Sequence, residues 1–235
     1  MNKQGNTYTI LYASVMVIIV AALLAVVSVS LKPMQQANIE IDKKKQILSS
    51  VNLEPTTQNA VELYNKYITD SYVVDAQGAK VEGADAFTVD VAAEVKKAEA
   101  ERQLPVFEAQ LDNGDMKYIL PLYGAGLWGP IWGYIAVDAD GNTIYGSYFA
   151  HQGETPGLGA EIENPTFQQQ FIGKHLFVDG EMKPVAVMKV GQKPLNGAEY
   201  VDAVSGGTIC PVISPTIRSA KSSFHPSTEK ALKKS

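Results

Sequence analysis

A run of 22 uncharged residues, from Ile10 to Leu31, limits what this chain can fold into more than any other feature. As an α-helix the run would be about 33 Å long, enough to cross a hydrocarbon layer of about 30 Å. A cleaved signal peptide is the alternative, because Lys3 precedes the run and small residues follow it. The apolar region of a signal is usually about 7–15 residues, however, so the length favours an uncleaved anchor. We therefore expect a short N-terminal segment, 1–9, and a transmembrane helix over 10–31.

Charge alone does not fix the orientation of this helix. Lys3 lies before the span, whereas Lys32 and residues 43–45, all lysines, lie after it. Counting positive charges would keep the C-terminal part in the cytoplasm, but a long soluble domain can cross a membrane regardless of charge.

Composition excludes several classes of function. The remainder of the 235 residues is long enough for one domain, and 46% of the chain is hydrophobic. A formal net charge of −5 argues against nucleic-acid binding, which usually needs a basic face. The single cysteine, Cys210, excludes an internal disulfide and a multi-cysteine metal or iron–sulfur site. The three histidines have no ligand-like spacing, so we predict no metal site.

The pattern of apolar residues predicts an α+β fold with an antiparallel sheet flanked by helices. Helical spacing indicates a connecting helix over 32–51 and a second helix over 60–70, and 92–102 has the composition of a solvated helix. Alternation predicts a strand at 87–91. Four further strands, 106–111, 116–122, 131–137 and 143–150, are joined in pairs by the turn signals 112–115 and 138–142. The soluble domain should cover 52–210.

Two glycine-rich segments accompany these strands. Residues 124–133 hold four glycines and both tryptophans, Trp128 and Trp132, so close backbone approach and flat aromatic surface occur together. A planar ring could use both, although buried tryptophans in a strand connection would give the same pattern. Residues 151–161 contain Glu154-Thr-Pro-Gly-Leu-Gly159, in which proline and glycines favour a loop with unpaired backbone N–H groups. Such a loop can cradle a phosphate or the polar edge of a ring.

The third motif is Asp202-Ala-Val-Ser-Gly-Gly-Thr208, where two glycines let the backbone bend beside exposed hydroxyls. Taken alone it could be a plain Gly-Gly turn. It resembles, however, the Asp-x-x-(Ser/Thr)-Gly-(Ala/Gly)-Thr signature of covalent flavin carriers. Together with Gly126-Leu-Trp-Gly129, the 154–159 loop and Phe171-Ile-Gly-Lys174, it has the order and spacing of the FMN-binding domain family.

The N-terminal part narrows the resemblance. Tyr8-Thr-Ile-Leu-Tyr-Ala-Ser-Val-Met-Val17 and Leu31-Lys-Pro-Met-Gln-Gln-Ala-Asn38 are similar to the family formed by the C subunits of Na+-translocating NADH:quinone reductases. The G subunit of the related electron-transport complex shares the flavin motifs and is the alternative. The resemblance implies an electron carrier in a six-subunit membrane complex, with its domain on the periplasmic side of the bacterial inner membrane.

The resemblance also implies the site. FMN would be esterified through its phosphate to Thr208 by a separate flavin transferase, with Ser205, Gly206 and Gly207 shaping the loop. Asp202 would serve structure or transferase recognition. Residues of the two glycine-rich segments would line the flavin: Glu154, Thr155, Gly157, Leu158, Gly159 and, unless it belongs to the core, Trp128. No catalytic acid, base or nucleophile is expected, because the cofactor carries the chemistry.

The sequence after Thr208 departs from the family. Cys210-Pro-Val-Ile-Ser-Pro215 would interrupt the amphipathic helix expected there, and 218–235 has little apolar periodicity. We expect 211–235 to be a divergent, disordered tail. It is either natural or, as we favour, the product of a shifted reading frame, and the nucleotide sequence would decide. A membrane-anchored binding or assembly protein without flavin is the rival from another functional class.

Overall fold

The structure is a computed structural model, and it describes residues 6–183, 185–194 and 197–205. The chain divides into two compact units, residues 1–43 and 44–235, which we describe separately. Residues 206–235, with the expected tail, Gly206, Gly207, Thr208 and Cys210, lie outside the described residues.

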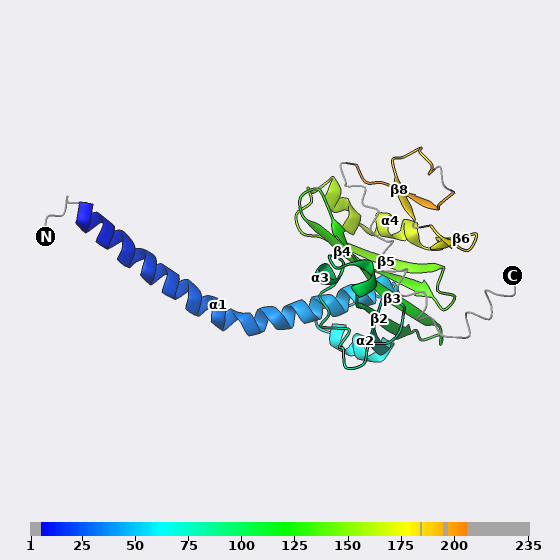
Figure 1. Ribbon diagram of the computed structural model, residues 1–235, viewed down its shortest axis with the longest axis horizontal. Helices are drawn as coiled ribbons and strands as arrows, with labels where there is room; N and C mark the ends of the chain where they lie inside the picture. The colour runs from blue at the N-terminus through cyan, green and yellow to red at the C-terminus, as the bar shows by residue number, and fades with distance from the viewer. Residues whose placement is uncertain (1–5, 184, 195–196, 206–235) are drawn as a thin grey trace. The chain divides into compact units, whose positions relative to one another are not determined.

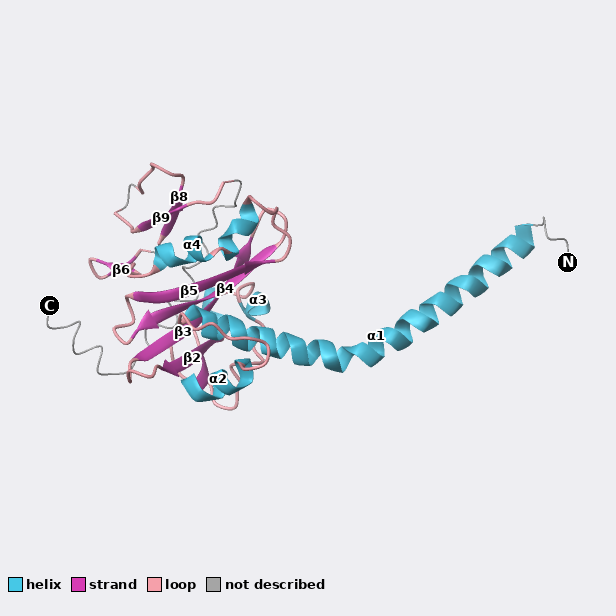
Figure 2. Ribbon diagram, turned by 180° about the vertical axis from the view of Figure 1, so that it is seen from behind, coloured by secondary structure: helices cyan, strands magenta, loops and turns pink. Residues whose placement is uncertain are grey.

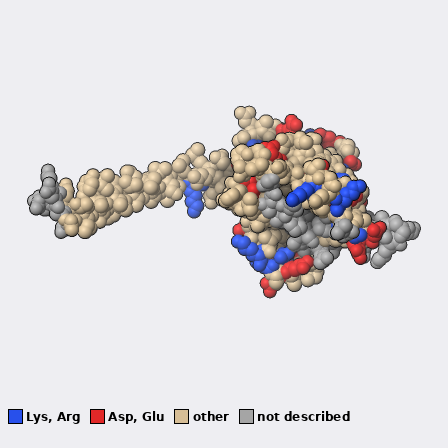
Figure 3. Space-filling model, turned by 90° about the horizontal axis from the view of Figure 1, so that it is seen from above, with Lys and Arg blue, Asp and Glu red and all other residues tan. Residues whose placement is uncertain are grey.

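The first unit is formed by helix α1 (Asn6–Ser50), whose last turns belong to the second unit. The two helical segments expected from the sequence, 10–31 and 32–51, form this one helix, which continues through Pro33 and ends one residue before 51. Its apolar part has the length and composition needed to cross a membrane, and no residue of the most apolar stretch is buried. Figure 3 shows the corresponding surface without acidic or basic side chains. This helix is therefore a candidate membrane span.

The second unit is built on a five-stranded antiparallel sheet in which every strand pairs with its neighbour in sequence, in the order β1-β2-β3-β4-β5 (Figures 1 and 2). Two small two-stranded sheets follow, β6 with β7 antiparallel and β8 with β9 parallel. The strands are β1 (Ile68–Val74), β2 (Leu104–Gln110), β3 (Met116–Ala125), β4 (Pro130–Asp138), β5 (Ile144–His151), β6 (Phe177–Val178), β7 (Glu181–Met182), β8 (Ala186–Met188) and β9 (Tyr200–Asp202). The further helices are α2 (Ala60–Tyr67), α3 (Val91–Glu94), η1 (Glu99–Glu101), η2 (Gly159–Glu163), α4 (Pro165–Gln168) and η3 (Gln169–Phe171). The α+β class predicted from the sequence is confirmed.

The sheet is covered on both faces, because successive side chains of a strand point to opposite faces. One face packs against the helices that follow β5, and its core includes Leu120, Phe149 and Phe171. The other face packs against the end of α1, and its core includes Ile47 and Phe107. Burial on both faces explains why the central strands are almost continuously apolar.

The end of α1 is fixed to the sheet by a capped terminus. Asn52 has a φ of 60°, and the N–H groups of Asn52 and Leu53 donate to the carbonyls of Ser49 and Leu48. This is the Schellman arrangement that closes many helices. The Asn52 side chain also donates to the carbonyl of Tyr145 in β5 at 3.0 Å. The last turns of α1 are therefore part of the domain.

Two of the predicted elements are wrong. Residues 87–91 do not form a strand: 86–88 are turn, and Asp90 caps α3 by accepting from the N–H groups of Ala92 and Ala93. Residues 92–102 do not form one helix, but two short helices, α3 and η1. The predicted helix over 60–70 ends at Tyr67, because Ile68 already begins β1.

Candidate functional site

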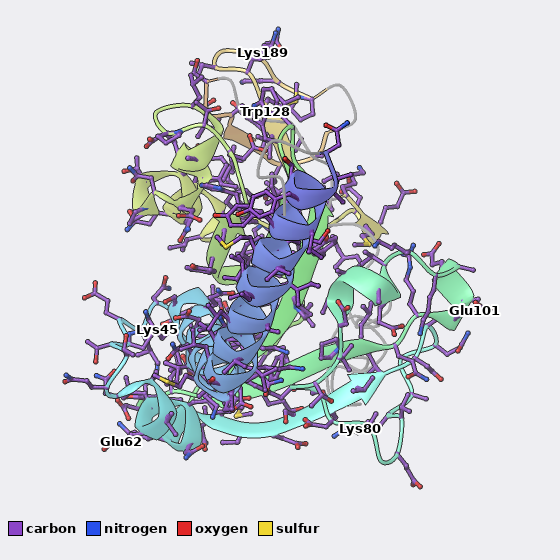
Figure 4. All side chains as sticks on the ribbon, turned by 90° about the vertical axis from the view of Figure 1, so that its left-hand side faces the viewer. Lys45, Glu62, Lys80, Glu101, Trp128 and Lys189 are labelled. Carbon is purple, nitrogen blue, oxygen red and sulfur yellow. The ribbon has the colours of Figure 1, made fainter. Side chains whose placement is uncertain are left out.

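The first glycine-rich segment forms the tight turn between β3 and β4. Gly126 donates its N–H to the carbonyl of Gly129 at 2.7 Å, and Ala125 pairs with Pro130 just before the turn. The two residues at the tip, Leu127 and Trp128, are 64% and 69% exposed. Trp128 is therefore not a core residue, and it lies on the side of the domain away from Glu62 of α2 (Figure 4).

The second glycine-rich segment begins where β5 ends. Leu158 donates its N–H to the carbonyl of Thr155 at 3.0 Å, with Pro156 and Gly157 between them. Gly157 has a φ of 75°, so Pro156-Gly157 occupies the central positions of a type II turn. Thr155 and Leu158 are both exposed. The predicted loop is thus present, and it offers another apolar side chain at the surface.

The expected cradle of unpaired N–H groups is wrong for most of this loop. The backbone N–H groups of Leu158 and Ala160 donate to the carbonyl of Thr155, and that of Glu161 donates to Leu158. The N–H of Gly157 donates to the side chain of Glu161 at 3.2 Å. The loop satisfies these donors itself, which makes it a rigid surface more than an anion nest.

Glu154 differs from its neighbours because it is buried, with 5% exposed. Its Oε1 accepts the backbone N–H of Trp128 at 3.1 Å. This contact joins the two glycine-rich segments across the end of the sheet. The sequence motif suggests a place beside the flavin for Glu154, whereas the structure turns its carboxylate toward the β3–β4 turn.

The third motif begins on β9, which ends at Asp202. Asp202 and Ser205 are exposed. The N–H of Asp202 donates to Oε1 of Gln170 at 2.8 Å, and the N–H of Ala203 donates to the carbonyl of Met188 at 2.7 Å. Sequence reasoning does not find Gln170, because nothing in its context distinguishes it from Gln168 or Gln169.

The Phe171–Lys174 motif attaches the helices after β5 to the start of that strand. Gly173 has a φ of 76° and donates its N–H to the carbonyl of Ile144 at 2.8 Å, while Ile144 donates to the carbonyl of Lys174 at 2.8 Å. The motif therefore has a structural explanation in the part of the chain that is described.

A side-chain contact between His175 and Glu199 holds the segment that leads into β9. Nδ1 of His175 lies 2.7 Å from Oε1 of Glu199, and the backbone N–H of His175 donates to Oε2 at 3.1 Å. Partial burial raises the pKa of Glu199, but the hydrogen bonds from His175, together with the charges of His175 and Lys174, outweigh it and lower the pKa below its ordinary value of 4.5. Folding therefore favours the ionised form of Glu199.

Acidification is expected to remove this contribution to stability. Because folding lowers the pKa of Glu199, the stabilisation is complete above pH 4.5 and is lost as the pH falls through the lower pKa of the folded state. Urea unfolding followed as a function of pH will measure the slope. Glu199→Gln keeps an accepting oxygen but does not titrate, so its stability should fall less steeply below pH 4.5; equal slopes for the two proteins would contradict the assignment.

Comparison with known proteins places these loops in a family. Residues 126–212, which contain most of the first glycine-rich segment, the whole of the second and the Ser205–Thr208 motif, match the FMN-binding domain. The chain is 33% identical to the C subunit of Na(+)-translocating NADH-quinone reductase from Vibrio parahaemolyticus, with 82% of this chain and 81% of the relative covered. It is 32% identical to the same subunit from Yersinia pestis, with 88% and 85% covered.

Solved structures agree with these relatives. The crystal structure of the C subunit of Na(+)-translocating NADH-quinone reductase from Parabacteroides distasonis superposes with a TM-score of 0.73 at 47% identity, covering 83% of this chain and 94% of that one. NqrC from Shewanella oneidensis gives a TM-score of 0.63 at 26% identity, covering 84% of this chain and 100% of that one. From its sequence and its fold alike, the chain belongs to the family formed by the C subunits of Na(+)-translocating NADH-quinone reductases.

Proposed function

We propose that this chain carries one FMN, bound covalently through its phosphate to Oγ1 of Thr208, and relays electrons within a Na+-translocating NADH:quinone oxidoreductase. The observation that carries the proposal is the match to the FMN-binding domain over residues 126–212, which covers most of the first motif and the whole of the other two. Bound FMN would supply one- and two-electron chemistry, whereas the chain would supply binding and orientation.

The described loops fit a flat ring system. Leu127, Trp128 and Leu158 expose apolar side chains on two loops that Glu154 joins. Exposed apolar residues gathered in this way are typical of a surface that something covers. The loop satisfies much of its own backbone hydrogen bonding, so the ring would meet a preformed surface.

The role of the attachment segment follows from its position. Gln170 and Met188 fix the backbone of Asp202 and Ala203, and this anchored part leads directly toward Thr208. We assign Ser205, Gly206 and Gly207 to shaping the loop. An ester at the phosphate would leave the ring free while preventing loss of the cofactor by diffusion.

The remaining parts of the proposal concern the membrane and the partners. Residues 10–31 of α1 would anchor the chain in the bacterial inner membrane, and residues 52–210 would form the FMN-binding domain on the periplasmic side. The partners would be the other subunits of a six-subunit complex, and a flavin transferase would form the ester. The exposed side chain of Ser205, three residues before Thr208 in sequence, supports access by such an enzyme.

In-gel flavin fluorescence of the denatured protein, produced together with its flavin transferase, tests the proposal. The wild type should fluoresce and Thr208→Ala should not, because denaturation removes all flavin that is not covalently bound. Ser205→Ala removes the neighbouring hydroxyl and is the matched control; it should keep the signal.

Other outcomes would change the proposal. Fluorescence in Thr208→Ala would move the attachment to another residue. An absence of signal in every variant would favour a binding or assembly protein without flavin, unless replacing 209–235 with a family-like C-terminus restored the signal.

A further inference from the structure

One buried carboxylate connects the two loops that the proposed function assigns to the flavin. Oε1 of Glu154 accepts the N–H of Trp128, a residue 26 positions earlier in the chain, at 3.1 Å. The backbone of Glu154 is fixed as well, since its N–H donates to Nδ1 of His151 at 3.1 Å. The side chain therefore starts from a fixed point after β5 and ends against the β3–β4 turn.

Two glycines make room for this carboxylate. A Cβ at Gly159 would meet only Glu154, with Oε2 the nearest atom. A Cβ at Gly126 would collide with Oε1 of Glu154 and also with the carbonyl oxygen of Gly129 and the side chain of Ile131. Neither glycine has a positive φ, so both are needed for space and not for backbone conformation. Gly157 is the opposite case: its φ is 75°, and a Cβ there would meet nothing within 4 Å. Glycines thus flank the same carboxylate on both sides.

We propose that Glu154 is a positioning residue that sets the distance between the β3–β4 turn and the 154–159 loop. It would thereby fix the gap between the exposed side chains of Trp128 and Leu158. This inference rests on the proposed function, because the gap matters only if the flavin ring occupies it. The hydrogen bond of a carboxylate to a backbone N–H is charge-assisted, which makes it a strong tie for a surface turn.

A positioning role and direct contact with flavin predict different behaviour. If Glu154 only contacted the cofactor, its replacement would leave the turn unchanged in flavin-free protein. A residue that holds Trp128 by its backbone must restrict the turn whether or not flavin is present. Flavin-free protein therefore separates the two roles, and the result does not depend on whether Thr208 is the attachment site.

The tryptophan content allows a direct measurement. The chain has two tryptophans, so Trp132→Phe leaves Trp128 as the only one. Steady-state fluorescence anisotropy of the full-length, flavin-free protein in detergent would then report the mobility of the turn. Anisotropy is the suitable signal because Trp128 is already 69% exposed, which limits what quenching could show.

In this background Glu154→Ala should lower the anisotropy of Trp128. Glu154→Gln retains an oxygen for the Trp128 N–H and should stay close to the parent. The matched control is Glu161→Ala. It removes a nearby carboxylate that accepts hydrogen bonds from Gly157 and Asn164 but not from the β3–β4 turn. It should leave the anisotropy unchanged.

A second measurement applies if Glu154→Ala folds poorly. Gly159→Ala should destabilise the protein when Glu154 is present and much less in the Glu154→Ala background, because the colliding oxygen is gone. Unchanged anisotropy in a folded Glu154→Ala protein would overturn the proposal. Equal costs of Gly159→Ala in both backgrounds would do so as well.

Discussion

Replacing Thr208 by alanine in the complete membrane complex is expected to stop NADH-driven quinone reduction and Na+ transport while the complex still assembles. A relay fails when one carrier is missing, and in the proposed function the FMN on Thr208 is the carrier of this subunit. With one cysteine it cannot form a disulfide of its own, so the cofactor would be its only two-electron carrier in the proposed role.

Purified complex and an assay of quinone reduction will measure this effect. Free FMN should then be added to the Thr208→Ala complex. Recovery of quinone reduction would mean that the loops bind flavin well and that the ester only retains it. Ser205→Ala should keep the wild-type rate. If purified Thr208→Ala complex turns over at the full rate without added FMN, the ester is not needed for electron transfer.

Replacing Phe171 by alanine is expected to destabilise the domain by about 3–5 kcal/mol, the usual cost of removing a buried phenylalanine. Phe171 is 1% exposed, and its ring centroid lies 5.0 Å from that of Phe149 and 5.5 Å from that of Phe167. The three rings join β5, α4 and η3 on one face of the sheet. Their loss would leave a cavity that the surrounding elements cannot close without moving.

Urea unfolding followed by circular dichroism will give the change in the free energy of unfolding. The matched control is Ile172→Ala at the adjacent position, where the side chain is 45% exposed and the cost should be much smaller. Because Gln170 precedes Phe171 and holds Asp202, the Phe171 variant should also be flavinylated less completely. Similar stabilities for the two variants would show that the ring cluster is not essential to the core.

The strands around the site can be predicted because local signals define them. Asp112–Asp115 and Asp138–Asn142 are turn sequences, and the strands on either side of them form as expected. Residues 87–91 are not predicted correctly in this way, because their alternating apolar side chains pack into the core without forming a strand. Phe87 and Val89 pack into the core on the face of the sheet that contacts the end of α1. Asp85 closes the turn at this point by accepting the N–H of Phe87. Tertiary packing explains that pattern, and a single sequence does not reveal it.

The sequence predicts which loops contribute to the candidate site, but not how the side chains on those loops are oriented and paired. The motifs mark Trp128, Leu158 and Ser205 as candidates, and the structure places all three at the surface, although the sequence left a core role open for Trp128. They cannot show that Glu154 turns inward, since its partner lies on a turn formed much earlier in the chain. Gln170 escapes sequence reasoning for the same reason: its role depends on a backbone N–H at Asp202 that only the folded chain brings near.

The neighbour-to-neighbour order of the main sheet also has a consequence for the time course of biosynthesis. Each strand from β2 to β5 pairs with the one made just before it, so in the proposed topology the sheet can close stepwise as the domain emerges on the far side of the membrane. Both glycine-rich loops belong to this early part. The segment with Thr208 is synthesised after β9, once the surface that would receive the ring is complete. Modification can therefore occur on a folded acceptor, and the flavin would enter its site from a segment made after the loops that would receive it.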